Sequence, residues 1–302
     1  MIKRFRGAIL GFAIGDALGM PVEGLSREDI RRIYGEIDDF LPSPYGDLKA
    51  GEWTDDTEQM ILLAKSILKT VYFSPDDFAD RLKTITSQRI GPTTRIAIRN
   101  LEFGIPWNMS GVESETCGSA MRVLPVGLVY SFSLDLVERY SVFSSIVTHR
   151  GSAVSGAVAI AIAVACILND WEEDDIVEEV VRRTKKFDEL VADKICLAYQ
   201  IADKDLDFAV NRLGNSISVY DAVPLTFYCY FSSSNFRDCA LKAVNAGGDT
   251  DSIAAMACGM MGCKLGIDAI PERWIERVRD ADMLIDLADR LHDLYLMISD
   301  IR

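Results

Sequence analysis

Two stretches far apart in the 302-residue chain place acids and hydroxyls directly after glycine. The first reads Gly51-Glu52-Trp53-Thr54-Asp55-Asp56-Thr57-Glu58, and the second reads Gly247-Gly248-Asp249-Thr250-Asp251-Ser252. Oxygen ligands with no Cys/His cluster nearby favour hard cations such as Mg²⁺ or Mn²⁺ over Zn²⁺. If the two stretches meet in space, we expect them to hold divalent metal between them.

A simpler interpretation is that each stretch only starts a helix, because acids and hydroxyls are favoured in a first helical turn. Asp55 with Glu58 would then form a capping box. Both following helices should be buried, however, so four carboxylates would enter a packed interior and need compensation. Neither stretch contains Lys or Arg, whereas two divalent cations would balance four negative charges.

The elements that would position these acids are predicted to be helices throughout. Apolar residues recur at helical spacing between Gly, Pro, Asp, Asn and Ser boundaries, and Ser74 with Pro75 marks one helix start. The segment from Ile217 to Phe231 favours a strand by propensity, but a lone strand would lack a partner, so we interpret it as a buried helix. The expected fold is an all-α, compact single domain over 1–302, with about a dozen or more helices. Besides the helix after Ser74, helices are expected at 2–14, 55–71, 92–103, 135–147, 151–168, 173–184, 187–202, 206–213, 234–245, 250–265, 271–279 and 281–299.

Composition narrows the possible partners. The chain is 49% hydrophobic, which is ample for a core, and its net charge of -14 repels nucleic acid and anionic lipid. Seven cysteines, an odd number without a C-x-x-C pair, favour a reducing cytoplasm. We expect a cytoplasmic protein with no membrane and no nucleic-acid partner; a monomer is favoured, although the sequence does not fix the oligomeric state.

Two apolar segments resemble membrane or export signals. The basic start before Gly7–Gly15 is similar to a signal peptide, but glycine recurs every fourth residue from Gly7 to Gly19, which lines one helix face for close approach of another helix. The uncharged run Gly151–Leu168 is at the lower length limit for a membrane span. Its Ala, Gly and Ser content favours the central helix of a bundle instead.

Five blocks of the sequence stand in order between residues 2 and 267: Gly15-Asp16-Ala17-Leu18-Gly19-Met20-Pro21-Val22-Glu23-Gly24, Trp53-Thr54-Asp55-Asp56-Thr57, Cys117-Gly118-Ser119-Ala120-Met121-Arg122, Thr148-His149 and Asn245-Ala246-Gly247-Gly248-Asp249-Thr250-Asp251-Ser252. Together these blocks resemble the ADP-ribosylglycohydrolase family. The resemblance implies an all-α fold with two divalent cations, Mg²⁺ or Mn²⁺. It also implies hydrolysis of the N- or O-glycosidic bond that joins ADP-ribose to a protein side chain or a small molecule.

Position by position, the resemblance also implies residue roles. Glu23 and Asp56 would act as general acid or base, without an assignment between them, and Cys117 stands where many relatives carry asparagine, which leaves the acceptor open. Serine stands at 252 where the family more often has threonine; it keeps the hydroxyl but loses the stiffening methyl group. The implied metal ligands are Thr54, Asp55, Asp56, Asp249, Asp251 and Ser252, and the implied ADP-ribose contacts are Gly118, Ser119, Met121 and His149.

Two other classes stay open from the sequence. All-α isoprenoid synthases also bind Mg²⁺-diphosphate, but they repeat acids over successive helical turns, whereas Asp55, Asp56 and Glu58 fall within one turn. A binding or structural relative without turnover is the second alternative. The irregular loop from Gly35 to Glu52 is a candidate substrate flap, and His292 is interpreted as structural.

Overall fold

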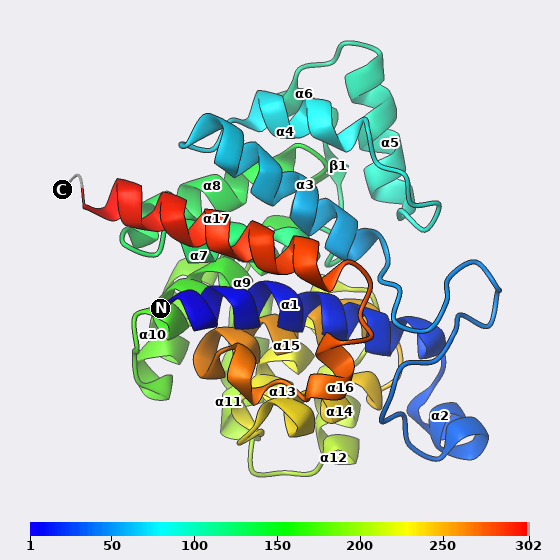
Figure 1. Ribbon diagram of the computed structural model, residues 1–302. Helices are drawn as coiled ribbons and strands as arrows, with labels where there is room; N and C mark the ends of the chain where they lie inside the picture. Colours follow the sequence, from blue (N-terminus) through cyan, green and yellow to red (C-terminus); the bar gives the residue numbers. More distant parts are fainter. Residues whose placement is uncertain (301–302) are drawn as a thin grey trace.

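A computed structural model describes residues 1–300 of the chain. These residues form 17 α-helices, three short 3-10 helices and one pair of two-residue parallel strands, β1 (Val112–Glu113) and β2 (His149–Arg150). The prediction of an all-α fold is therefore confirmed (Figure 1).

The centre of the fold is a close pair of helices, α1 (Ile2–Gly19) and α15 (Thr250–Leu265). A Cβ atom added at Gly15 would lie 2.2 Å from the carbonyl oxygen of Ala254, and one at Gly19 would lie 2.3 Å from that of Thr250. The glycine stripe on α1 thus brings the two backbones into direct contact, as the four-residue spacing predicts. Figure 1 shows α1 between α15 and the C-terminal helix α17 (Ala281–Ser299), both of which pack on it.

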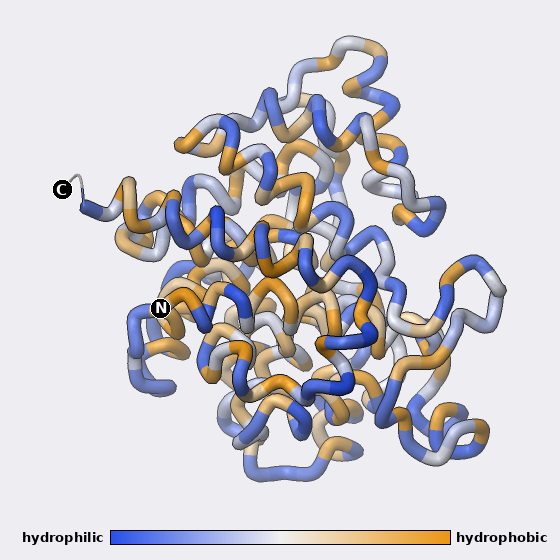
Figure 2. The backbone as a smooth tube through the Cα atoms, in the orientation of Figure 1, coloured by the Kyte–Doolittle hydropathy of each residue, from blue (hydrophilic) through white to orange (hydrophobic). Residues whose placement is uncertain are grey.

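Both apolar helices that resemble membrane segments are covered by protein. Within residues 1–300, one helical span, Ile2–Val22, is long and apolar enough to cross a membrane, and 94% of its apolar window is buried. Every residue of α9 (Ala153–Leu168) is buried as well. Figure 2 shows hydrophobic segments gathered where the central helices overlap, while the peripheral loops are largely hydrophilic.

Most predicted helices are present, with several corrections at their ends. The first helix continues beyond residue 14 to Gly19 and into a 3-10 turn at Met20–Val22, because glycine packing against α15 stabilises it. The segment 271–279 forms only one turn, α16 (Glu272–Ile275). The other predicted helices are α3 (Asp55–Thr70), α4 (Pro75–Leu82), α5 (Pro92–Glu102), α8 (Leu134–Ile146), α10 (Glu173–Thr184), α11 (Glu189–Gln200), α12 (Leu206–Leu213), α13 (Val219–Phe231) and α14 (Phe236–Val244).

Helix α13 settles the ambiguous aromatic segment in favour of a helix. It begins after Ser218, whose hydroxyl accepts a hydrogen bond from the backbone N–H of Tyr220, and it carries Pro224 within its length. Burial among other helices outweighs the strand propensity of its aromatic and β-branched residues. Asp221 lies inside the first turn of this helix, and Ser218 is its N-cap.

Three helices were not expected from the sequence. Helix α2 (Arg27–Tyr34) is short and buries only Ile30, although Ile30, Ile33 and Tyr34 do stand at helical spacing. Helix α7 (Leu124–Val129) is buried on every side, so it shows no polar face. Helix α6 (Trp107–Ser110) is a single turn. The candidate flap between α2 and α3 is irregular, as expected.

Candidate metal centre

The first acidic stretch is fixed at the start of α3 by a carboxylate from α1. Thr54 is the N-cap of α3, and its hydroxyl accepts a hydrogen bond from the N–H of Asp56 at 3.2 Å. Asp16, fully buried on α1, accepts bonds from the N–H groups of Thr54 and Thr57 at 3.0 and 3.1 Å and from the Thr57 hydroxyl at 2.6 Å. The central helix therefore sets where Asp55 and Asp56 lie.

The capping box predicted at α3 is wrong. The carboxylate of Glu58 accepts hydrogen bonds from the N–H groups of Thr86 and Ser87 at 2.7 and 2.8 Å instead of closing on its own helix start. The cap is Thr54, one residue earlier than Asp55. Neither Asp55 nor Asp56 therefore serves as the cap of α3.

The second acidic stretch is held by a glycine turn that other loops clamp. Gly247 and Gly248 have φ angles of +75° and +76°, a region that side chains disfavour. A Cβ at Gly248 would lie 1.9 Å from the carbonyl oxygen of Asn215, which accepts the N–H of Asp249 at 2.8 Å. Gly248 also exchanges backbone hydrogen bonds of 2.8 Å with Leu25 and Gly24, which follow Glu23. The turn thereby ties Asp249 to the loop that carries Glu23.

The two stretches meet at one cavity of about 290 Å³. Carboxylate oxygens of Glu23, Asp249 and Asp251 all lie within 4.8 Å of one another, a grouping that could hold a metal ion. Of the predicted site residues, the cavity wall includes Glu23, Asp55, Asp56, Gly118, Met121, His149, Asp249, Asp251 and Ser252.

Two of the predicted residues lie behind this wall. Thr54 lines a neighbouring cavity of about 250 Å³ and not the acidic one. The hydroxyl of Ser119 is fully buried; it donates to the carbonyl of Ala153 at 3.1 Å and accepts from the hydroxyl of Ser145 at 2.8 Å. Its side chain is thus occupied by packing rather than turned toward the cavity.

Burial and mutual repulsion control the protonation of these acids. Burial, with the negative charges of Asp16 and Glu23, raises the pKa of Asp55 to about 7. Burial is also the main cause that raises the pKa of Asp56 and Asp251 well above the usual carboxyl value, and neighbouring acids add to it. The carboxyls therefore favour the protonated state unless positive charge enters the cavity.

The donor set fits a hard divalent cation. Asp56 is only 4% exposed, and its Oδ2 atom has no hydrogen-bond partner within residues 1–300. A buried carboxylate oxygen without a partner is costly, and a bound cation would satisfy it. All the acidic and hydroxyl groups on this wall offer oxygen, the ligand atom that Mg²⁺ and Mn²⁺ prefer.

One positive side chain, which sequence patterns did not indicate, also reaches the cavity. Arg89 lies in the loop between α4 and α5, and its Nη1 is 3.3 Å from Oε2 of Glu23. The same guanidinium binds Asp47 at 2.8 Å and the hydroxyl of Ser43 at 2.7 Å, both on the candidate flap. No motif marks Arg89, because its position depends on two loops that fold against each other.

A buried histidine also lines the cavity. His149 is 2% exposed, and its Nδ1 lies 2.7 Å from the Thr148 hydroxyl. Burial and the nearby Arg122 lower the pKa of His149 well below its usual value, which keeps the ring neutral. Gly118 gives this ring its space, since a Cβ there would lie 2.6 Å from Nε2.

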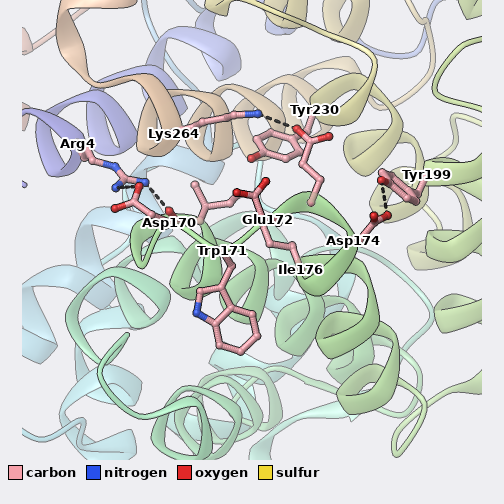
Figure 3. Close-up of a pocket in the computed structure, with 11 residues that line it drawn as sticks. Arg4, Asp170, Trp171, Glu172, Asp174, Ile176, Tyr199, Tyr230 and Lys264 are labelled. Carbon is pink, nitrogen blue, oxygen red and sulfur yellow. Dashed lines mark hydrogen bonds and ion pairs between the residues drawn. The ribbon is translucent and has the colours of Figure 1, made fainter.

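A larger recess of about 540 Å³ lies elsewhere, against α10, α11 and the C-terminal part of α15 (Figure 3). Both of its basic side chains are already paired with acids. Arg4 binds Asp170 at 2.7 Å, and Lys264 binds Glu173 at 2.7 Å. None of the acids that line the 290 Å³ cavity lines this recess, so the recess is not the candidate site despite its larger size.

The chain thus combines an all-α fold with a carboxylate-lined cavity between two helix starts, and comparison with known families identifies its class. The family model described as ADP-ribosylglycohydrolase matches residues 1–299, so the chain belongs to this family. The family resemblance expected from the five blocks is thereby confirmed.

Individual relatives agree with this assignment. An uncharacterised protein of Archaeoglobus fulgidus is 56% identical over 99% of both chains. The ADP-ribosylarginine hydrolase Tri1 of Pseudomonas putida is 29% identical over 97% of this chain and 78% of its own. A solved structure described as an ADP-ribosylglycohydrolase-related protein complex aligns with a TM-score of 0.74 and 26% identity, covering 97% of this chain and 98% of that one.

Proposed function

We propose that the protein hydrolyses the glycosidic bond between ADP-ribose and its acceptor at a dinuclear Mg²⁺ or Mn²⁺ centre. The observation that carries the proposal is the meeting of both acidic helix starts at one cavity that contains the unpaired Oδ2 of Asp56. Family membership supports a hydrolase of this general class.

The proposed metal ligands are the oxygen donors of the two helix starts. Thr54 keeps one lone pair of its hydroxyl after accepting the Asp56 N–H, so it stays in the proposed set although it lies behind the wall. Bound cations would supply Lewis-acid chemistry, holding the ribose hydroxyls and water and stabilising charge in the transition state. The set is Thr54, Asp55, Asp56, Asp249, Asp251 and Ser252.

Two carboxylates are proposed to move the protons. Hydrolysis breaks the bond between the anomeric carbon and the acceptor through an oxocarbenium-like state, while water adds to that carbon and gives up a proton. Glu23 is well suited to this exchange, because its side chain is 44% exposed at the cavity edge, while partial loss of solvent around its carboxyl and the charge of Asp249 raise its pKa. Asp56 is the other candidate for the general acid or base.

His149, Gly118 and Met121 are proposed to receive the ADP-ribose. Gly118 presents backbone without a side chain, and the neutral ring of His149 lies against it. The cavity of about 290 Å³ is near the lower end of the range for small-molecule sites, about 300–1,000 Å³, and is open to solvent on one side. Ser119 would support this loop through its buried hydroxyl bonds.

We propose that the acceptor, to which ADP-ribose is attached, is a protein side chain or a small molecule. Among relatives, the printed name of Tri1 specifies ADP-ribosylarginine. We also propose a cytoplasmic monomer, for which seven free thiols and the acidic surface are supporting observations. A relative that binds ADP-ribose without cleaving it is the alternative; intact carboxylates at 55, 56, 249 and 251 disfavour it.

The test is a hydrolysis screen. Metal-free protein would be offered ADP-ribosylated arginine, ADP-ribosylated serine peptides and ADP-ribosyl nucleotides, with Mg²⁺, with Mn²⁺ and with a chelator, and released ADP-ribose would be measured. We expect metal-dependent release that Asp56→Ala and Asp249→Ala abolish and that Asp286→Ala, on the exposed face of α17, leaves unchanged. Binding of ADP-ribose without release on any substrate would favour the binding module, and undiminished turnover in both site variants would overturn the proposal.

A further inference from the structure

We propose that Cys117 is an additional ligand of the metal centre, through which the protein binds thiophilic divalent cations such as Cd²⁺, Zn²⁺ and Co²⁺. This inference rests on the proposed metal site. Cys117 lines the same cavity as the acids, and it is 1% exposed. It is the one cysteine on that wall within residues 1–300.

The geometry places sulfur within one coordination shell of a proposed ligand. The Sγ atom of Cys117 donates a hydrogen bond to Oδ2 of Asp249 at 2.9 Å. With metal–sulfur and metal–oxygen bonds of about 2.3 and 2.1 Å, two ligand atoms at octahedral to tetrahedral angles lie about 3.1–3.6 Å apart. A movement of a few tenths of an ångström by the thiol would therefore let one cation bind both atoms, within the range that its side-chain torsion allows.

An independent observation shows that the same cavity has a ligand atom to spare. The Oδ2 atom of Asp56 is buried and has no hydrogen-bond partner within residues 1–300. Glu23 and Asp251 offer oxygens within 4.8 Å of those of Asp249. The sulfur of Cys117 is not part of that group of three, so a cation that binds Cys117 and Asp249 would complete its coordination when the other carboxylates of the cavity turn toward it.

The binding step balances without an oxidant. The cation replaces the thiol proton, one metal–sulfur bond forms, the sulfur–hydrogen bond breaks, and the proton leaves to the buffer. Hard cations gain little from sulfur, so Mg²⁺ and Mn²⁺ would still depend on the oxygen ligands. Thiophilic cations would therefore compete with them at this site and slow ADP-ribose release.

The test measures metal binding in the absence of substrate. Metal-free wild-type protein, Cys117→Ser and Cys196→Ser would be titrated with Cd²⁺ while thiolate-to-cadmium charge-transfer absorption is followed. Serine at 117 keeps a hydrogen-bond donor for Asp249, and Cys196 is the partly exposed control thiol on α11. We expect a saturable band in wild type and Cys196→Ser, its loss in Cys117→Ser, and a Cd²⁺ affinity lower by roughly tenfold or more in that variant.

A second measurement needs no variant. X-ray absorption of the zinc-loaded wild-type protein should show one sulfur neighbour at about 2.3 Å together with oxygen neighbours. Absence of that sulfur, or a cadmium band that persists in Cys117→Ser, would overturn the inference. If Mn²⁺ binds and supports ADP-ribose release while no sulfur signal appears, only the role of Cys117 fails; if no divalent cation binds at all, the proposed metal-dependent function fails with it.

Discussion

Asp55 and His149, which both line the acidic cavity, are joined by a continuous chain of buried hydrogen bonds. Gln59 donates to Asp55 at 2.8 Å and accepts from Nη1 of Arg122 at 2.8 Å. Nη2 of Arg122 donates to the Thr148 hydroxyl at 2.7 Å, which lies 2.7 Å from Nδ1 of His149. The start of α3 and strand β2 therefore cannot move independently.

Breaking this chain at its middle should destabilise the fold. Gln59→Leu keeps a similar volume but removes the acceptor that lies 2.8 Å from Nη1 of Arg122, which then keeps only the Gly118 carbonyl at 3.5 Å, and it removes the side-chain donor to Asp55. We expect a loss of about 2–3 kcal/mol in the free energy of unfolding, measured by urea denaturation. The control Gln200→Leu, on the exposed end of α11, should change stability by less than about 0.5 kcal/mol. Equal effects of the two substitutions would show that the chain contributes nothing.

A methyl group on the glycine stripe should separate the two central helices. Gly15→Ala would place Cβ 2.2 Å from a backbone oxygen of α15, which no side-chain rotation can relieve. We expect a destabilisation of about 3 kcal/mol or more, seen as a lower midpoint of thermal unfolding. Gly91→Ala is the matched control, because Gly91 has a negative φ and open space around its Cβ position. A Gly15→Ala midpoint equal to that of the control would contradict the close contact.

The acidic cavity should make metal-free protein less stable at neutral than at mildly acidic pH. A carboxyl whose folded pKa exceeds its unfolded value of about 4 binds more protons when folded, so stability falls as pH rises between those values. For Asp55, with a folded pKa of about 7, the window is pH 4 to 7. We expect wild type to lose on the order of 2 kcal/mol across it relative to Asp55→Asn.

The quantity to compare is the difference in the free energy of unfolding between wild type and Asp55→Asn at each pH. His149 works in the opposite sense, since its lowered pKa costs stability as pH falls, but it is common to both proteins. Mn²⁺ should raise the unfolding midpoint more at pH 7.5 than at pH 5.5, because bound ligands must lose their protons. Identical pH profiles for wild type and Asp55→Asn would contradict the raised pKa.

The hydroxyl of Ser252 should contribute to metal affinity. Ser252→Ala removes this oxygen, and we expect the Mn²⁺ dissociation constant to rise roughly tenfold, measured by calorimetry. Ser252→Thr restores the hydroxyl and should bind Mn²⁺ within about threefold of wild type, provided that the extra methyl fits beside Met121. Unchanged affinity in Ser252→Ala would remove Ser252 from the ligand set.

The candidate flap should loosen when its arginine anchor is lost. Asp47 accepts two hydrogen bonds from Arg89, at 2.8 and 2.9 Å, and these hold the flap against the loop beside Glu23. Asp47→Asn should increase hydrogen exchange in segment 41–50 about tenfold, which corresponds to about 1.4 kcal/mol. The control is Asp38→Asn on the same irregular segment. The Asp38 carboxylate is 3.8 Å from each of its arginine partners, too far for a hydrogen bond, so this substitution should leave exchange in segment 41–50 unchanged.

The sequence predicts those parts of the site that local chemistry determines. Glycine followed by acids correctly marks the starts of α3 and α15, and glycine spacing correctly predicts the close packing of α1. The roles of Asp16, Arg89 and Gln59 could not be predicted, because each depends on contacts between residues at least 38 positions apart. The same reason explains the error at Glu58, whose partners lie on another loop.

The contact between α1 and α15 limits how far the acidic cavity can vary among members of the family. One helix carries Asp16 and leads to Glu23, the other begins after Asp249, and their separation is set by main-chain atoms at Gly15 and Gly19. Main-chain atoms are the same in every sequence. Side chains elsewhere in the core can therefore drift over evolutionary time while the distance between the acids of the two helices stays constant, as long as these glycines remain.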